Sequence, residues 1–380
     1  MTDPVFRALV TLAETEGSSR GRFCISCHSN VGTTAKAVPQ PIVFDDMNSI
    51  VLEGVTCESC HRVGEVVRPA NAAHILDPRA PMQGTARAGE ASPYHETARS
   101  PVLGTSELCG SCHDVQLETG VDLESPYAEW KQSPARSDGL VCIDCHMPRT
   151  IGIAAEGFDL PERPVRRHTF LGMGALSAAT SSGKPGLEAL EAEVRLLLAQ
   201  SVSVRVESDV FASPAGARVY LMVQNHVAGH RIPTGSAFFR QLWLRVWIGD
   251  AKGTTYFDSR LSGEGDPRIR DRFLFSARLF DEVAEPTLFP WRAASLQSTA
   301  LQPGEERLVT VPFPLDSAVR GPLIIEASLE MRAFPPELIA QLGLDARLAE
   351  PLSISTTASL RPVRSECNDS GPQRSCASER

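Results

Sequence analysis

The pentapeptide Cys24-Ile25-Ser26-Cys27-His28 recurs three times further along the chain, with changes only at its two middle positions. The pattern Cys-x-x-Cys-His is the attachment site of c-type haem, in which the two thiols bond to the porphyrin and the histidine reaches the iron. We therefore expect four covalently bound haems c. The predicted attachment residues are Cys24, Cys27, Cys57, Cys60, Cys109, Cys112, Cys142 and Cys145, and the predicted proximal iron ligands are His28, His61, His113 and His146.

Other uses of these cysteines fit the pattern less well. A structural zinc site takes four ligands from paired clusters, and its histidines usually stand several residues apart. A thioredoxin-like redox site needs a single Cys-x-x-Cys pair, and an iron–sulfur site does not require a histidine after every pair. The histidine that directly follows the second cysteine in all four copies therefore favours haem.

Length and composition bound the remaining possibilities. The 380 residues suggest two domains, or one domain with a large appendage. No apolar run approaches the roughly 18 residues that a membrane span needs, so we expect a soluble chain without a transmembrane segment. The formal net charge of −9 argues against a nucleic-acid partner, because such proteins concentrate lysine and arginine to neutralise phosphates.

The predicted haem chemistry also indicates a compartment. Haem attachment through this motif takes place outside the cytoplasm, so we expect a periplasmic or extracellular protein, in keeping with its use of cysteine. The opening residues Met1 to Arg7 contain neither a basic segment nor a long apolar one, and no signal peptide is visible. We expect that this segment was trimmed or that the start is misplaced.

The predicted haem sites all lie in residues 1–175, which we interpret as a tetrahaem cytochrome c domain. The first cysteines of the four motifs are spaced by 33, 52 and 33 residues, which suggests two haem-pair units. Short helices are expected after Thr2-Asp3-Pro4 and over residues 124–132. Little chain is available for each haem, so the porphyrins should supply much of the apolar core and regular structure should be modest. The form without haem should not fold.

Residues 176–360 have a different pattern, which predicts a linker helix followed by a β-domain. Leu187, Leu190, Val194 and Leu197 recur at helical spacing within residues 185–200. The fold class is therefore α+β, with an antiparallel immunoglobulin-like β-sandwich after the haem domain. Residues 361–380 read as a polar tail in which Cys367 and Cys376 are expected to form a disulfide. The predicted strands, alternating or β-branched runs, are residues 202–207, 218–224, 241–248, 254–258, 307–312 and 323–331.

Several segments outside the motifs resemble one family, the multihaem cytochromes c that accept electrons in hydroxylamine oxidation by nitrifiers, together with their extracellular relatives. The resemblance covers most of residues 1–235 and implies electron transfer through closely packed haems, mostly with two histidine ligands each. The segments that carry it are Ser92-Pro-Tyr-His95, Ser106-Glu-Leu-Cys109, Ser125-Pro-Tyr-Ala-Glu-Trp130-Lys-Gln-Ser-Pro134, Arg167-His-Thr-Phe-Leu-Gly172 and Gly229-His-Arg-Ile-Pro-Thr-Gly235.

Five histidines remain for the four distal iron positions. His95, His168 and His230 are the preferred candidates because of their settings in these segments, while His226 and His74 stay open as alternatives. A methionine is the less favoured ligand when histidines are available. We further hypothesise that His230 leaves the β-domain to bind a haem held by residues 1–175, in its own chain or in a neighbouring one.

These expectations favour an electron carrier over an enzyme. Four haems would pass electrons between extracytoplasmic redox partner proteins, and no catalytic group is required. Two alternatives stay open. One is a haem enzyme with one five-coordinate iron that acts on a small nitrogen or sulfur species. The other is a subunit of an extracellular conducting filament, which self-associates through haem ligation.

Overall fold

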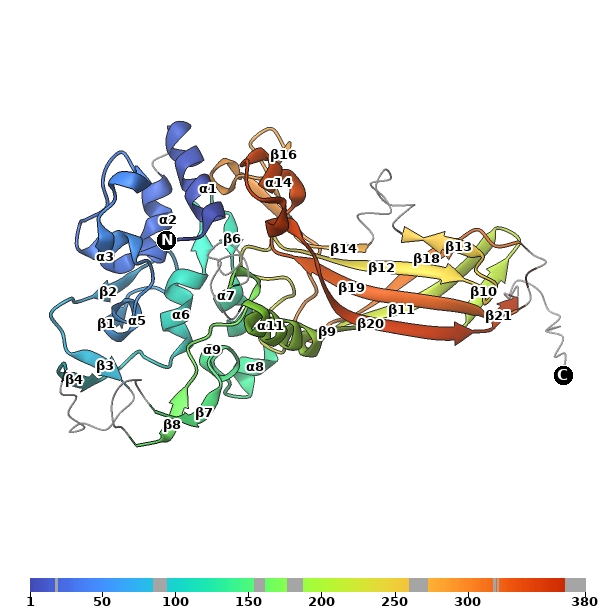
Figure 1. The fold of residues 1–380 in the computed structure, drawn as a ribbon, viewed down its shortest axis with the longest axis horizontal. Helices are drawn as coiled ribbons and strands as arrows, with labels where there is room; N and C mark the ends of the chain where they lie inside the picture. Colours follow the sequence, from blue (N-terminus) through green and yellow to red (C-terminus); the bar gives the residue numbers. More distant parts are fainter. Residues whose placement is uncertain are drawn as a thin grey trace.

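The computed structural model describes residues 1–17, 20–84, 94–153, 161–175, 187–259, 273–316, 319 and 321–365. Its helices from α1 to α9 gather on one side, and long strands extend away from them to the other side (Figure 1). None of the described helices is long and apolar enough to cross a membrane. Cys367 and Cys376 lie outside the described residues, and so does their predicted disulfide.

The first helices enclose a small apolar core. Helix α1 (Pro4–Thr15) begins where Asp3 accepts hydrogen bonds from the amides of Val5 and Phe6, at 2.8 and 3.2 Å. The predicted helix after Thr2-Asp3-Pro4 is thus confirmed. The elements that follow are α2 (Arg20–His28), α3 (Asn30–Thr34), η1 (Phe44–Asp46), α4 (Ser49–Leu52) and α5 (Glu58–His61). Their core consists of Val10, Ile25, Val38, Ile42, Phe44, Met47 and Val51.

The second half of the helical part consists of short helices and two-stranded sheets. The predicted helix at residues 124–132 is confirmed as α7, which begins at Pro126. The helices are α6 (Ser106–His113), α7 (Pro126–Lys131), α8 (Pro134–Ser137) and α9 (Cys142–His146). The paired strands are β1 (Val63–Val66) with β2 (His74–Leu76), β3 (Met82–Gly84) with β4 (Thr97–Arg99), β5 (Val115–Gln116) with β6 (Asp122–Glu124), and β7 (Arg149–Gly152) with β8 (Arg163–Arg166).

Helix α11 (Leu187–Ser201) leads into two five-stranded sheets. All the pairings in them are antiparallel except that of β10 with β21. The first has the order β18-β11-β10-β21, with β9 also on β11, and the second has the order β13-β12-β19-β20, with β14 also on β12. The strands are β9 (Val202–Val206), β10 (Val210–Ser213), β11 (Gly216–Asn225), β12 (Gln241–Gly249), β13 (Thr255–Asp258), β14 (Leu274–Phe275), β18 (Glu306–Phe313), β19 (Leu323–Arg332), β20 (Leu352–Arg361) and β21 (Val363–Ser365).

Smaller elements join the sheets to the helical part. A three-stranded sheet has the order β16-β15-β17, and Figure 1 shows β16 and α14 at the end of the molecule where the large sheets meet the helices. The Arg20 guanidinium of α2 donates to the backbone oxygen of Trp291 at 2.9 Å, which ties the two parts together. These elements are β15 (Ala277–Phe280), β16 (Pro286–Thr287), η2 (Pro290–Arg292), β17 (Ser295–Ser298), α14 (Pro336–Gln341) and η3 (Ala346–Ala349).

Both large sheets contribute to one hydrophobic core, because alternate residues of each strand point inward. In β11, for example, Val219, Leu221 and Val223 are fully buried. The mixed helix and sheet content and the six predicted strands are confirmed; the immunoglobulin-like type of sandwich is not. The same core includes Val5 and Leu123 from the helical part, so the division at residue 175 stays a prediction.

Candidate haem sites

Each of the four motifs ends a short helix at its histidine. Helix α2 ends at His28, α5 at His61, α6 at His113 and α9 at His146. Residues three apart lie on the same face of a helix, so this conformation turns both thiols of a motif to one side. The eight motif cysteines are free thiols. Helices α2, α6 and α9 contain both thiols of their motif with its histidine, and in the second motif Cys57 is the N-cap residue of α5.

The third motif lies beside the first and the fourth. The Cys112 thiol interacts with that of Cys27, and the Cys109 thiol interacts with that of Cys142. These contacts, together with burial, raise the pKa of the Cys27 and Cys109 thiols. Helix α6, which carries Cys109 and Cys112, is therefore the meeting point of three motifs.

Two motif histidines face a predicted distal histidine. The ring centroids of His61 and His168 are 6.3 Å apart, with 26° between the ring planes. Those of His146 and His230 are 6.1 Å apart, at 25°. His168 follows β8, and His230 follows β11, so both partners come from segments far along the chain from the motif that they meet.

Backbone carbonyl groups orient all four of these rings. The Nδ1 atoms of His61, His168 and His230 lie 2.6, 2.9 and 2.9 Å from the backbone oxygens of Gln83, Arg166 and Arg231. The ring of His146 has a backbone partner at Leu171. An Nδ1–H that donates to a carbonyl leaves Nε2 unprotonated, which is the tautomer that binds a metal ion.

The separation of the paired rings fits a metal ion between them. Metal–imidazole bonds are about 2 Å long, so two Nε2 atoms on opposite sides of one ion place the ring centroids roughly 6 Å apart. Burial, and then the neighbouring His230, lower the pKa of His146, which favours the neutral imidazole that coordinates a metal. The residues of both pairs thus fit the axial positions of a haem.

The other two motif histidines have different surroundings. The Phe6 ring is stacked on the His28 ring at 4.1 Å, with 24° between the planes. Burial, and then the charge of His113, lower the pKa of His28 to about 4, so this ring is neutral. Among the described residues, which include all nine histidines, no second histidine ring stacks on His28 or His113.

His74 is held by hydrogen bonds at both ring nitrogens. Its Nε2 lies 3.0 Å from Nδ2 of Asn30, and its Nδ1 lies 3.0 Å from Oγ of Ser111. The Asn30 amide also donates to the backbone oxygen of Ser59 at 2.9 Å. Asn30 follows the first motif, Ser59 is in the second and Ser111 is in the third, so this network connects three motifs. Sequence reasoning missed Asn30, whose position two residues after His28 is the only sequence indication of it.

The remaining candidates, His95 and His226, do not meet a motif histidine. His95 is exposed, and its Nδ1 lies 3.2 Å from the backbone oxygen of Glu96. His226 is exposed beside the first large sheet, with its Nε2 2.8 Å from Oγ of Ser203. The structure therefore brings two of the five candidates, His168 and His230, to a motif histidine and leaves the roles of the others as predictions.

The segments that carry His168 and His230 are fixed to the helical part by charged side chains. The Arg166 guanidinium donates to the backbone oxygens of Ile143 and Met147 at 2.7 and 3.1 Å, and to Asp144 of α9 at 2.8 Å. In the other segment, Glu129 of α7 binds the loop at residues 229–235. The sequence analysis did not single out either contact, because each joins residues far apart in the chain.

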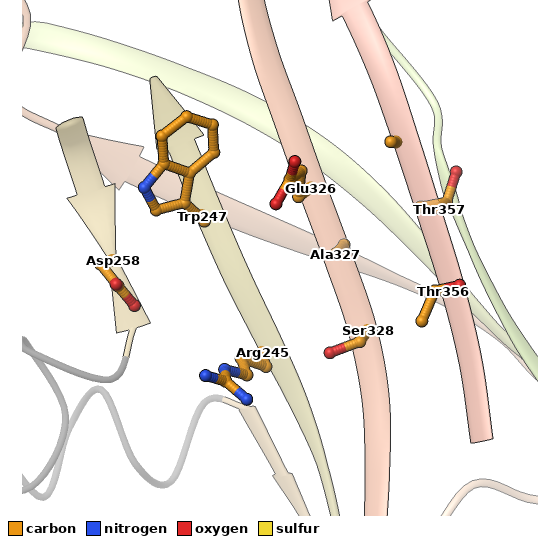
Figure 2. Close-up of a pocket in the computed structure, with 9 residues that line it drawn as sticks. Arg245, Trp247, Asp258, Glu326, Ala327, Ser328, Thr356 and Thr357 are labelled. Carbon is orange, nitrogen blue, oxygen red and sulfur yellow. The ribbon is translucent and has the colours of Figure 1, made fainter. Parts of the chain in front are cut away.

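Two surface hollows lie outside the paired rings. The first, of about 350 Å³, lies on the outer face of the second large sheet, where Arg245, Trp247, Asp258 and Glu326 line it (Figure 2). Its lining includes no cysteine or histidine, so it is separate from the haem motifs. The second, of about 650 Å³, is lined by residues 119–132, the loop after His230 and β17.

Comparison with known proteins shows the fold of the chain. No protein-family model matches, and no curated protein matches either. The structure is similar to the crystal structure of a penta-heme cytochrome c552 from Thermochromatium tepidum, with a TM-score of 0.62 and 21% sequence identity, over 90% of this chain and 85% of that one. The chain therefore shares the fold of that cytochrome. That protein contains five haems, whereas this chain has four motifs.

Proposed function

We propose that this protein is an extracytoplasmic multihaem cytochrome c that carries electrons between redox partner proteins through four covalent haems. The observation that carries the proposal is the pairing of His61 with His168 and of His146 with His230. Each pair has the separation that one axially ligated iron needs, and each ring is oriented by a backbone carbonyl. The fold of a multihaem cytochrome supports the same assignment.

The residues have separate roles in this proposal. The eight motif cysteines bind the porphyrins, and the four motif histidines ligate the irons from one side. His168 and His230 ligate two of them from the other side, and His95 is proposed for a third. Bound haem supplies a one-electron couple, Fe(III)/Fe(II). Helix α6 brings the thiols of its motif against those of α2 and α9, which keeps neighbouring attachment sites close enough for electrons to move between them.

We also propose three regions: a haem domain at residues 1–175, a β-domain with its linker helix at residues 176–360, and a tail at residues 361–380. The β-domain, with an immunoglobulin-like sandwich, serves as the rigid support from which a ligand loop reaches the haem domain. The partners are redox proteins met outside the cytoplasm, where thioether attachment of haem takes place.

The haem count tests the proposal directly. The full chain, produced in a host competent for cytochrome c maturation, should gain the mass of four haems in denaturing mass spectrometry. Its electronic spectrum should be mostly low-spin, since paired histidine ligands give low-spin iron. A saturated count below four would overturn the assignment, and so would a spectrum in which every haem is high-spin.

A second function, catalysis at one open iron, is favoured by the hydrogen bonds of His74 and His226. Both nitrogens of His74 and Nε2 of His226 have protein partners, which leaves three histidines for four distal positions. An iron without a sixth ligand could act on a small nitrogen or sulfur species. His74→Ala decides this point: the proposed open site requires that the number of low-spin haems stays the same, whereas loss of one low-spin haem would make His74 a ligand. Six-coordination that appears only on assembly would instead favour the conducting filament.

A further inference from the structure

We propose that Glu129 is the positioning residue for His230, and that it determines how firmly the fourth haem iron keeps its second ligand. The inference rests on the proposed function, because it takes His230 as the partner of His146. It goes further by assigning the control of that ligand to a carboxylate in the helical part, which touches neither the iron nor the porphyrin.

Glu129 is buried where α7 meets the loop at residues 229–235. Only 9% of its side chain is exposed. Its Oε2 accepts hydrogen bonds from the amide of Arg231 at 2.9 Å and from the hydroxyl of Thr234 at 2.8 Å. Its Oε1 accepts one from the hydroxyl of Ser125 at 3.1 Å and lies 3.7 Å from the Arg231 guanidinium. One carboxylate therefore binds both halves of this loop.

These contacts act on the His230 ring through a short path. The amide that Glu129 accepts belongs to the residue directly after His230, and the backbone oxygen of that same Arg231 lies 2.9 Å from Nδ1 of His230. Arg231 is thus held at its nitrogen by Glu129 and orients the imidazole with its oxygen. Nε2 of His230 is left free to face His146, whose ring centroid is 6.1 Å away.

The β-domain holds the backbone carbonyl group of His230. The fully buried Asn225, at the end of β11, donates from Nδ2 to the backbone oxygen of His230 at 3.2 Å. It also donates to the backbone oxygens of Leu301 and Gln302. The backbone around His230 is therefore held from two sides, by Asn225 of the β-domain and by Glu129 of the helical part. Of these two side chains, Glu129 carries a charge and Asn225 does not. A charge-assisted hydrogen bond is the stronger type.

Loss of the Glu129 carboxylate should loosen the ligand without removing it. In Glu129→Ala, the Arg231 amide and the Thr234 hydroxyl lose their acceptor in a buried site, and the loop must move to reach water. Removal of such a second-layer partner typically weakens metal binding about 10- to 100-fold. In Glu129→Gln one acceptor oxygen remains, so the effect should be smaller.

Glu193 offers a matched control. It also pairs with an arginine next to a proposed distal ligand, since both of its carboxylate oxygens lie 2.9 Å from Arg167, which precedes His168. However, Glu193 is 38% exposed, and its contacts within the described residues are with the side chain of Arg167 and not with the backbone beside the ligand. Exposed pairs of this type contribute little. Glu193→Gln should therefore leave the iron coordination unchanged.

The test uses the full haem-loaded protein and measures carbon monoxide binding to the reduced form, together with the high-spin fraction of the oxidised form. Glu129→Ala should increase the apparent affinity of one haem for carbon monoxide about tenfold or more, Glu129→Gln less, and Glu193→Gln not at all. Added imidazole should return Glu129→Ala to the low-spin state, and an unchanged denaturant-unfolding transition would show that the site is still folded. If Glu129→Ala does not fold, Glu129→Gln and Thr234→Ala provide the same test.

The His230→Ala variant tests ligation by His230 separately from the role of Glu129. If this variant has the same number of low-spin haems and the same carbon monoxide binding as the wild type, His230 is not a ligand and the ligation itself is wrong. If His230→Ala opens one haem while the Glu129 variants behave like Glu193→Gln, the ligation stands and the role of Glu129 is overturned.

Discussion

The helical part and the β part of this protein bury apolar surface in different ways. Each large sheet directs alternate residues into a shared core, where side chains such as Leu221 and Ile325 are fully buried. The first helices have a separate core of seven residues, and the eight motif cysteines of the helical part are half-buried or exposed. A part with so little side-chain core needs apolar surface from elsewhere, which four porphyrins would supply. The β part needs no such supplement.

The largest expected effect comes from removing all haem. Replacing the eight motif cysteines by serine should leave the helical part unfolded, whereas the β part, whose two large sheets supply most of the residues of the main core, should stay folded. Limited proteolysis with mass spectrometry should then show cleavage throughout residues 1–175 and protection of the sheets. Equal protection of both parts would contradict the comparison.

Removal of a single distal ligand should change the spin state of one haem in the helical part and should leave the stability of the β part unchanged. His168→Ala removes the ring that faces His61 at 6.3 Å, so one of the proposed haems should change from low-spin to high-spin. Electron paramagnetic resonance would measure this change, and urea unfolding would monitor the sheets. An unchanged spectrum would show that His168 is not a ligand.

The reverse experiment changes the β core alone. Leu221→Ala deletes a fully buried side chain in the middle of β11, so it should lower the free energy of unfolding of the β part by about 2–5 kcal/mol. Denaturant unfolding followed by tryptophan fluorescence would measure this loss, with haem spectra recorded in parallel. A loss of low-spin haem before the sheets unfold would mean that the two parts are not separate in stability.

The smallest effect is expected at a contact that bridges the parts. Hydrogen bonds from Arg292 and Trp291 hold the pKa of Glu16 below its usual range, and Arg292 lies 2.5 Å from the carboxylate. Because the folded pKa is depressed, this stabilisation is present above the unfolded pKa and is lost as the pH falls through the folded one. At neutral pH, Glu16→Gln should cost less than about 1 kcal/mol in unfolding free energy, since such partly exposed pairs are weak. The difference from the wild type should vanish in acid, and a difference that grows in acid would refute this account.

Local sequence patterns predicted those helices and strands that helix caps or alternating apolar residues specify. The Thr2-Asp3-Pro4 cap identified α1, residues 124–132 contain α7, and alternating or β-branched runs identified β11, β12 and β19. The helices that end at the four motif histidines were not predicted. Strand β20 escaped because its ten residues, Leu352–Arg361, are mainly serine, threonine and alanine, so the alternation is faint. Its place is set by pairing along nearly the whole of β19.

Of the candidate haem sites, the sequence motif specified only the residues within each motif. The Cys-x-x-Cys-His pattern specifies attachment residues and proximal histidines without a fold. The partners of those histidines depend on tertiary contacts: nothing near His61 in the sequence indicates His168, and Glu129 meets Arg231 across 102 positions of chain. The prediction that His230 would reach the haem part needed the resemblance of its loop to a family segment, and its ligation stays a prediction.

The position of His168 and His230 after all four motifs has a consequence for the order of biosynthesis. A chain emerging from the ribosome, or crossing a membrane N-terminus first, presents every attachment site before either of these two residues. Arg166 then fixes the His168 segment to the backbone of α9, so the second motif receives its partner only after the fourth motif has formed its helix. Under the proposed ligation, haem attachment can proceed on an open chain, and His168 and His230 close their two irons only after the last attachment site has been made.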